Sequence, residues 1–85
     1  MAYTVEFRPA ARREFLRLTP EVQARIKPDI EALADTPRPL GCQKLGGDGN
    51  LWRIRVGDYR IVYQVHDRVL LVVVVRVAHR REAYR

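Results

Sequence analysis

Cysteine is scarce in this sequence, which limits the kinds of site it can hold. Cys42 is the single cysteine, so an intrachain disulfide is excluded. It has no second cysteine and no ordered set of histidine and aspartate partners, so neither a metal centre nor a cysteine nucleophile is indicated. The GGDG segment at 46–49 lacks the Lys-Ser/Thr pair of a phosphate-binding loop. We therefore expect no metal and no cofactor.

Long apolar runs are missing as well. The longest, at 69–75, has seven residues, whereas a membrane-spanning helix needs roughly 20. The opening MAYTVEFR lacks the charged and apolar regions of a secretory signal. We therefore expect a cytoplasmic protein with no membrane partner.

Acidic residues are fewer than basic ones. Ten Asp+Glu against 16 Lys+Arg give a net charge of +6 and a pI near 10.2. Such a surface attracts polyanions or an acidic protein partner. With 85 residues, 47% of them hydrophobic and 31% charged, the chain suffices for one folded domain, 1–85, and is too short for two cores.

The N-terminal part predicts one strand and two helices. Apolar side chains alternate over positions 2–7, which is typical of a half-buried strand. Pro9 suits the first turn of a helix, which we expect to end at about Leu18. Thr19-Pro20-Glu21 is typical of an N-cap, a first helical position and an acidic first turn, so a second helix follows. Pro28 lies inside it and predicts a kink or a break into two helices.

A loop and a hairpin follow. Positions 35–49 hold two prolines and four glycines, a composition that predicts a loop. Gly57-Asp58 between LWRIRV and YRIVYQV indicates a two-residue hairpin turn. This turn sets a register of five facing pairs: Val56 with Tyr59, Arg55 with Arg60, Ile54 with Ile61, Arg53 with Val62, and Trp52 with Tyr63. The aromatic and aliphatic side chains should then cover the helices, with the three arginines on the other face.

The C-terminal part supplies one more strand. After a turn at His66-Asp67-Arg68, the segment VLLVVVVRV is apolar on both faces, so we place it in the middle of the sheet with the 2–7 strand beside it. The tail at 78–85 shows no periodicity. Spacing alone does not place its arginines, Arg80 and Arg81, relative to the hairpin.

The sharpest chemical signal is Arg55 opposite Arg60 on one face of a tight hairpin. Like charges directly across a ladder repel, and a sequence that tolerates this usually places an anion there. The guanidinium fork suits phosphate or carboxylate, so the ligand is a nucleic-acid backbone or an acidic peptide. The alternative is a solvated face on which the long side chains splay apart.

Two tail residues have both chemical and structural interpretations. His79 is a candidate general acid near neutral pH, although a lone histidine is more often a structural hydrogen-bonding group. Tyr84 can stack on a base or simply pack at the terminus. The hairpin aromatics, in contrast, belong to the expected core.

Four segments together resemble the RelE/ParE superfamily of bacterial toxins. They are YTVEFRPAARREFLRL, KLGG, WRIRVGDYRIVYQV and VAHRREAY, which occur in that order and cover essentially the whole chain. The resemblance implies an α+β fold of two N-terminal helices packed on a mostly antiparallel four-stranded sheet, in the order β-α-α-β-β-β. This agrees with the layout expected from the residue pattern.

The resemblance also implies a function. It implies a toxin of a type II toxin-antitoxin system, blocked by an acidic antitoxin, with operator DNA bound only through the complex of the two proteins. In the RelE branch the toxin enters the ribosome and cuts mRNA without a metal, by attack of a 2′-hydroxyl on its own phosphate. That branch implies an endoribonuclease that inhibits translation.

Site residues carry over position by position. Arg53 and Arg55 match basic positions of the second strand, and Arg60 matches the arginine that binds the scissile phosphate. Arg80 matches a tail arginine implicated in charge stabilisation and leaving-group protonation, Tyr84 a tyrosine that stacks on or orients the nucleotide, and His79 a histidine that is catalytic in some members. The expected RNA-binding set is Arg53, Arg55, Arg60, Arg80 and Arg81.

The general base and the branch stay open. Arginine remains protonated and cannot remove the proton of the 2′-hydroxyl. His79, Tyr84 or a nucleotide group then acts as the base, or proximity and charge alone carry a slower reaction. In the ParE branch the same fold inhibits DNA gyrase instead of cutting RNA. A third interpretation is an inactive module that only pairs with its antitoxin.

Overall fold

The N-terminal half forms one strand and two helices, as the sequence predicts. The computed structural model describes residues 2–46 and 50–83. Strand β1 (Thr4–Phe7) leads into α1 (Pro9–Leu16), which ends two residues before the expected Leu18. Helix α2 (Pro20–Glu31) follows, with a 3-10 turn, η1 (Ala32–Ala34), at its end. The Thr19 hydroxyl caps α2 by accepting a 3.3 Å hydrogen bond from the Val22 amide.

The expected break at Pro28 is wrong, because α2 is one continuous helix through that position. Proline removes the hydrogen bond that position 28 would donate to the carbonyl of Ala24. Ala24 and Pro28 are both exposed, so water can bind that carbonyl. Water therefore replaces the lost hydrogen bond at the surface, and the buried side of the helix is unaffected.

The sheet has five strands rather than the expected four, in the order β1-β5-β4-β3-β2. The remaining strands are β2 (Gln43–Leu45), β3 (Leu51–Val56), β4 (Tyr59–His66) and β5 (Leu71–His79). The extra strand, β2, has three residues and lies within the predicted loop 35–49, where glycine and proline hide its pattern. β1 pairs with β5 in parallel and every other pairing is antiparallel, so the α+β class is confirmed.

The hairpin register is confirmed at all five predicted pairs. Gly57 in the turn has a φ of 60°, which glycine adopts without the steric cost that a Cβ imposes. The apolar C-terminal strand is β5, an interior strand that has β1 beside it, as expected. It begins at Leu71, after a 3-10 turn, η2 (Asp67–Val69), and the central strand of the sheet is β4 instead. A register shift between Val62 and Tyr63 marks an irregularity in the β4–β5 pairing.

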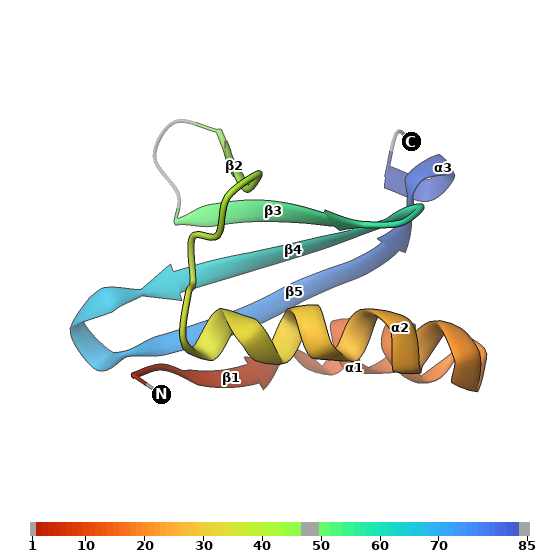
Figure 1. Ribbon diagram of the computed structural model, residues 1–85, viewed down its shortest axis with the longest axis horizontal. Helices are drawn as coiled ribbons and strands as arrows, with labels where there is room; N and C mark the ends of the chain where they lie inside the picture. The colour runs from red at the N-terminus through yellow and green to blue at the C-terminus, as the bar shows by residue number, and fades with distance from the viewer. Residues whose placement is uncertain (1, 47–49, 84–85) are drawn as a thin grey trace.

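The core lies between the helices and one face of the sheet. Figure 1 shows α1 and α2 on the same side of the sheet, with the short helix α3 (Arg80–Ala83) beside the β3–β4 turn. The most completely buried large side chains are Ile26, Ile30, Leu33, Ile61, Tyr63, Val65, Val72 and Val74. Within the described ranges, no helix is long and apolar enough to cross a membrane. This core fixes the β3–β4 hairpin, on which the candidate site is built.

Candidate functional site

An arginine-lined hollow lies at the tip of the β3–β4 hairpin. It has a volume of about 180 Å³ and is lined by Arg55, Gly57, Asp58, Tyr59, Arg60 and Arg80. Three of these six residues are arginines and one is acidic, so the hollow carries an excess of positive charge. We refer to it below as the arginine hollow.

Two features of the fold bring the three arginines together. The hairpin register places Arg55 directly opposite Arg60, so the two share one face of the sheet. The Arg80 amide donates a 2.7 Å hydrogen bond to the carbonyl of Asp58 in the turn, which anchors the start of α3 against the hairpin. This backbone contact places the tail arginine beside the other two, an arrangement that spacing alone did not predict.

Arg53 does not line the arginine hollow. It stands on the same face as Arg55, as the register predicts, but it is only 6% exposed. Its guanidinium donates a hydrogen bond to the side-chain oxygen of Gln43, its cross-strand neighbour in β2. The strand that the sequence did not reveal therefore covers this residue and gives it a structural partner.

The other tail residues are arranged differently. The ring of His79 meets that of Tyr59 edge-on, with centroids 5.3 Å apart, on the face opposite Arg55. Its Nδ1 accepts a 3.2 Å hydrogen bond from the Arg81 amide, an arrangement in which the neutral ring carries its proton on Nε2. The Arg81 side chain is exposed and does not line the hollow. Tyr84, expected to contact the nucleotide, lies outside the described residues.

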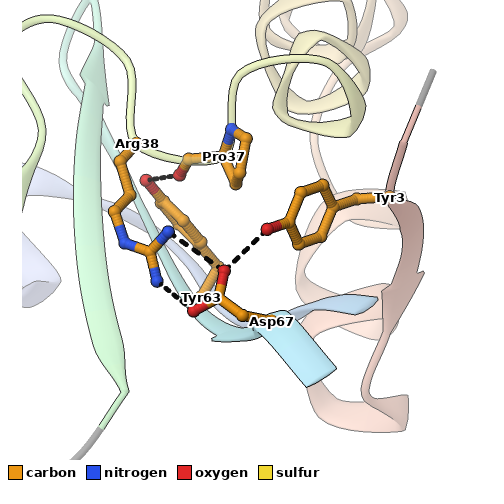
Figure 2. Close-up of polar contacts among 5 residues, drawn as sticks. All are labelled: Tyr3, Pro37, Arg38, Tyr63 and Asp67. Atoms are coloured by element: carbon orange, nitrogen blue, oxygen red, sulfur yellow. Dashed lines mark hydrogen bonds and ion pairs between the residues drawn. The ribbon is translucent and has the colours of Figure 1, made fainter. Parts of the chain in front are cut away.

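A second polar cluster joins three segments at the opposite end of β4. Figure 2 shows the Arg38 guanidinium donating to both oxygens of Asp67, at 3.2 and 2.7 Å, while the Tyr3 hydroxyl donates to the same carboxylate at 2.6 Å. Beside them the Tyr63 hydroxyl donates to the carbonyl of Pro37 at 2.8 Å. The cluster ties β1, the loop before β2 and the β4–β5 turn together, and no sequence pattern announced it.

The electrostatics of this second cluster are those of a structural clamp. The hydrogen bonds from Arg38 and then from Tyr3 lower the pKa of Asp67 to about 2. Burial raises the pKa of Tyr63 well above its usual value, so that hydroxyl remains a donor. Arg38 also lies 5.1 Å from the ring centre of Trp52, a cation–π contact that holds it in place. Across the described chain, no three His, Cys, Asp or Glu side chains are grouped to hold a metal ion.

Comparison with known proteins places the chain in a family. The model for the ParE toxin of the type II toxin-antitoxin system, parDE, matches residues 5–84. Toxin RelG of Mycobacterium tuberculosis is 37% identical over 100% of this chain and 99% of its own, and the mRNA interferase toxin RelE of Escherichia coli K12 is 31% identical over 98% and 88%. A chain of the archaeal RelE-RelB complex from Pyrococcus horikoshii OT3 superposes with a TM-score of 0.82 at 26% identity, over 94% of this chain and 97% of that one. The chain therefore belongs to the RelE/ParE superfamily, as a RelE-like toxin of a type II toxin-antitoxin system.

Proposed function

We propose that this toxin is an endoribonuclease that cleaves mRNA on translating ribosomes and so inhibits translation. The observation that carries the proposal is the arginine hollow, where Arg55, Arg60 and Arg80 surround one small space. Guanidinium groups bind phosphate through paired N–H donors, so the hollow suits the scissile phosphate of an RNA strand. The relative named mRNA interferase supports the substrate class.

The proposed reaction uses a nucleophile that the RNA itself supplies. The 2′-oxygen attacks the adjacent phosphorus, and as this bond forms the bond from phosphorus to the 5′-oxygen breaks. One proton leaves the 2′-hydroxyl and one reaches the 5′-oxygen, which gives a 2′,3′-cyclic phosphate and a 5′-hydroxyl. Negative charge builds up on the phosphoryl oxygens in the transition state, where fixed positive groups stabilise it most.

The arginines take separate parts in this reaction. Arg60 binds the phosphate and Arg55 helps to neutralise the negative charge of that phosphate. Arg80 stabilises the charge that develops on the leaving oxygen. Arginine stays protonated at neutral pH, so none of the three removes the 2′-proton. Since His79 faces Tyr59 rather than Arg55, we assign most of the rate enhancement to charge and positioning.

The proposed protein partner is an acidic antitoxin, with operator DNA bound only by the toxin–antitoxin complex. The charge of +6 favours such a partner, and the archaeal neighbour was solved as a RelE-RelB complex. We propose that the antitoxin binds in a groove of about 620 Å³ between β1, α1 and α2. Its lining is mostly apolar and also holds two basic and two acidic residues; the lining residues are Val5, Glu6, Phe7, Arg12, Phe15, Leu16, Lys27, Ile30 and Glu31.

Primer-extension mapping of a reporter mRNA in a purified translation reaction tests the nuclease. The wild type should produce breaks within codons on translating ribosomes, and Arg60→Ala should lower the cleavage rate by about 10²- to 10³-fold. Arg68→Ala is the matched control. Arg68 is exposed in η2, at the other end of β4, and its substitution removes the same charge. Full cleavage by a folded Arg60→Ala variant would overturn the assignment.

Gyrase inhibition is the second candidate, because the matching family model is that of the ParE toxin. A supercoiling assay with purified gyrase separates the two activities. Inhibited supercoiling without mRNA breaks would favour the ParE-like function. Neither effect, together with no growth arrest on induction, would leave an inactive antitoxin-binding module.

A further inference from the structure

Helix α2 sends one arginine to the tip of the hairpin. A Cβ placed on Gly57 would lie 3.3, 3.4 and 3.6 Å from Nη2, Cζ and Nε of Arg25. These three nearly equal distances mean that the flat face of the guanidinium is turned toward the side of Gly57 on which a Cβ would project. Gly57 also lines the arginine hollow, so Arg25 lies across one backbone residue from the site.

Arg25 reaches this position instead of pairing with its own helix. Glu21 and Asp29 lie one turn away on either side, at the spacing that favours ion pairs on a helix. Within residues 2–46 and 50–83, however, Arg25 makes no hydrogen bond and no ion pair, and its side chain is exposed. Guanidinium donors point outward in the plane of the group, so a guanidinium that turns its flat face toward Gly57 keeps its donors available to a ligand.

We propose that Arg25 forms a second phosphate subsite at the hairpin tip, which binds an RNA backbone phosphate adjoining the one in the arginine hollow. The proposal rests on the proposed RNA-cleaving function. Gly57 separates the two subsites, so an RNA strand that crosses the hairpin turn contacts Arg25 on one side of Gly57 and the arginine hollow on the other. Arg25 then acts in binding and register, and the three arginines of the hollow act on the reacting phosphate.

Salt-dependent RNA binding tests the subsite without requiring cleavage. The probe is a fluorescein-labelled single-stranded RNA with 2′-O-methyl groups, which cannot be cut, and the measurement is anisotropy at increasing salt. Loss of one phosphate contact should lower the slope of log K against log salt by about 0.7 and weaken binding about three- to tenfold at low salt. We expect this for Arg25→Ala and not for Arg68→Ala, which removes an exposed arginine at the far end of β4.

Cleavage kinetics on programmed ribosomes give the second readout. Arg25→Ala should raise the toxin concentration for half-maximal cleavage and leave the maximal rate within about twofold, since it does not contact the reacting atoms. Equal binding slopes for Arg25→Ala and Arg68→Ala would overturn the subsite, even if the wild type cleaves mRNA. A lower slope for Arg25→Ala with a wild type that cuts nothing would support the subsite and refute the nuclease.

Discussion

Replacing Glu14 should destabilise the protein through the outer edge of β5. β1 pairs with β5 only at positions 71–74, so the later residues of β5 have no strand on that side. The Glu14 carboxylate of α1 fills this gap: it accepts a 2.8 Å hydrogen bond from the Val77 amide and lies 3.4 Å from the Arg76 guanidinium. Val77 is buried and the Glu14 side chain is 28% exposed, so the amide is poorly placed to bind water after the carboxylate is removed.

The magnitude follows from what each variant leaves behind. Glu14→Ala leaves the Val77 amide without its charged hydrogen-bond acceptor, which lowers the free energy of unfolding by about 2 kcal/mol. Glu14→Gln keeps an oxygen acceptor at the same place and should cost about 0.5–1 kcal/mol. Arg76→Ala removes only the ion pair, whose arginine is 50% exposed, so we expect a loss of less than about 0.5 kcal/mol.

Urea unfolding followed by circular dichroism measures these differences. With an m value of about 1 kcal/mol per molar urea, Glu14→Ala should lower the unfolding midpoint by about 2 M, and Glu14→Gln by about 0.5–1 M. Equal losses for the two variants would show that the charge, not the hydrogen bond, supplies the stabilisation. A loss below about 0.5 kcal/mol for Glu14→Ala would refute the edge-capping role altogether.

Two further predictions concern the opposite end of β4. Tyr63→Phe removes the donor to the carbonyl of Pro37 and should lower the free energy of unfolding by about 1 kcal/mol in the same urea assay, and an unchanged midpoint would contradict this. Asp67 has a pKa of about 2 in the folded protein against an ordinary 3.8, so its contribution to stability is present above pH 4 and is lost as the pH falls from about 4 toward 2. Asp67→Asn should lack this component, so its deficit relative to the wild type should shrink over that interval in thermal unfolding at several pH values, and a constant deficit would contradict the assignment.

The hairpin shows how far local chemistry carries a prediction. A two-residue turn at Gly57-Asp58 leaves one register, and that register fixes which side chains face one another before any tertiary contact is known. The opposition of Arg55 and Arg60, the centre of the candidate site, follows from the turn alone. The two helices and the alternating strands are predicted for the same reason, since their patterns are local.

The features that escaped prediction depend on contacts between distant segments. β2 is a three-residue edge strand with no alternation of its own, and its pairing with β3 is what buries Arg53. The residue pattern alone did not place Arg80, which only the family resemblance assigned to the site, and its position depends on a backbone hydrogen bond to the hairpin turn. Arg25 reaches the same turn from a helix whose sequence shows only an exposed polar position. The sequence pattern therefore identified the hairpin arginines by position, while their neighbours required the packed structure.

The parallel pairing of β1 with β5 has a consequence for how the toxin is made. β1 has no partner in the sheet until β5 has been synthesised, so closure of the sheet depends on a pairing between segments far apart in the sequence. The arginine hollow follows the same order, since Arg80 comes directly after β5. A nascent or truncated chain that lacks this strand holds neither a completed sheet nor the third arginine.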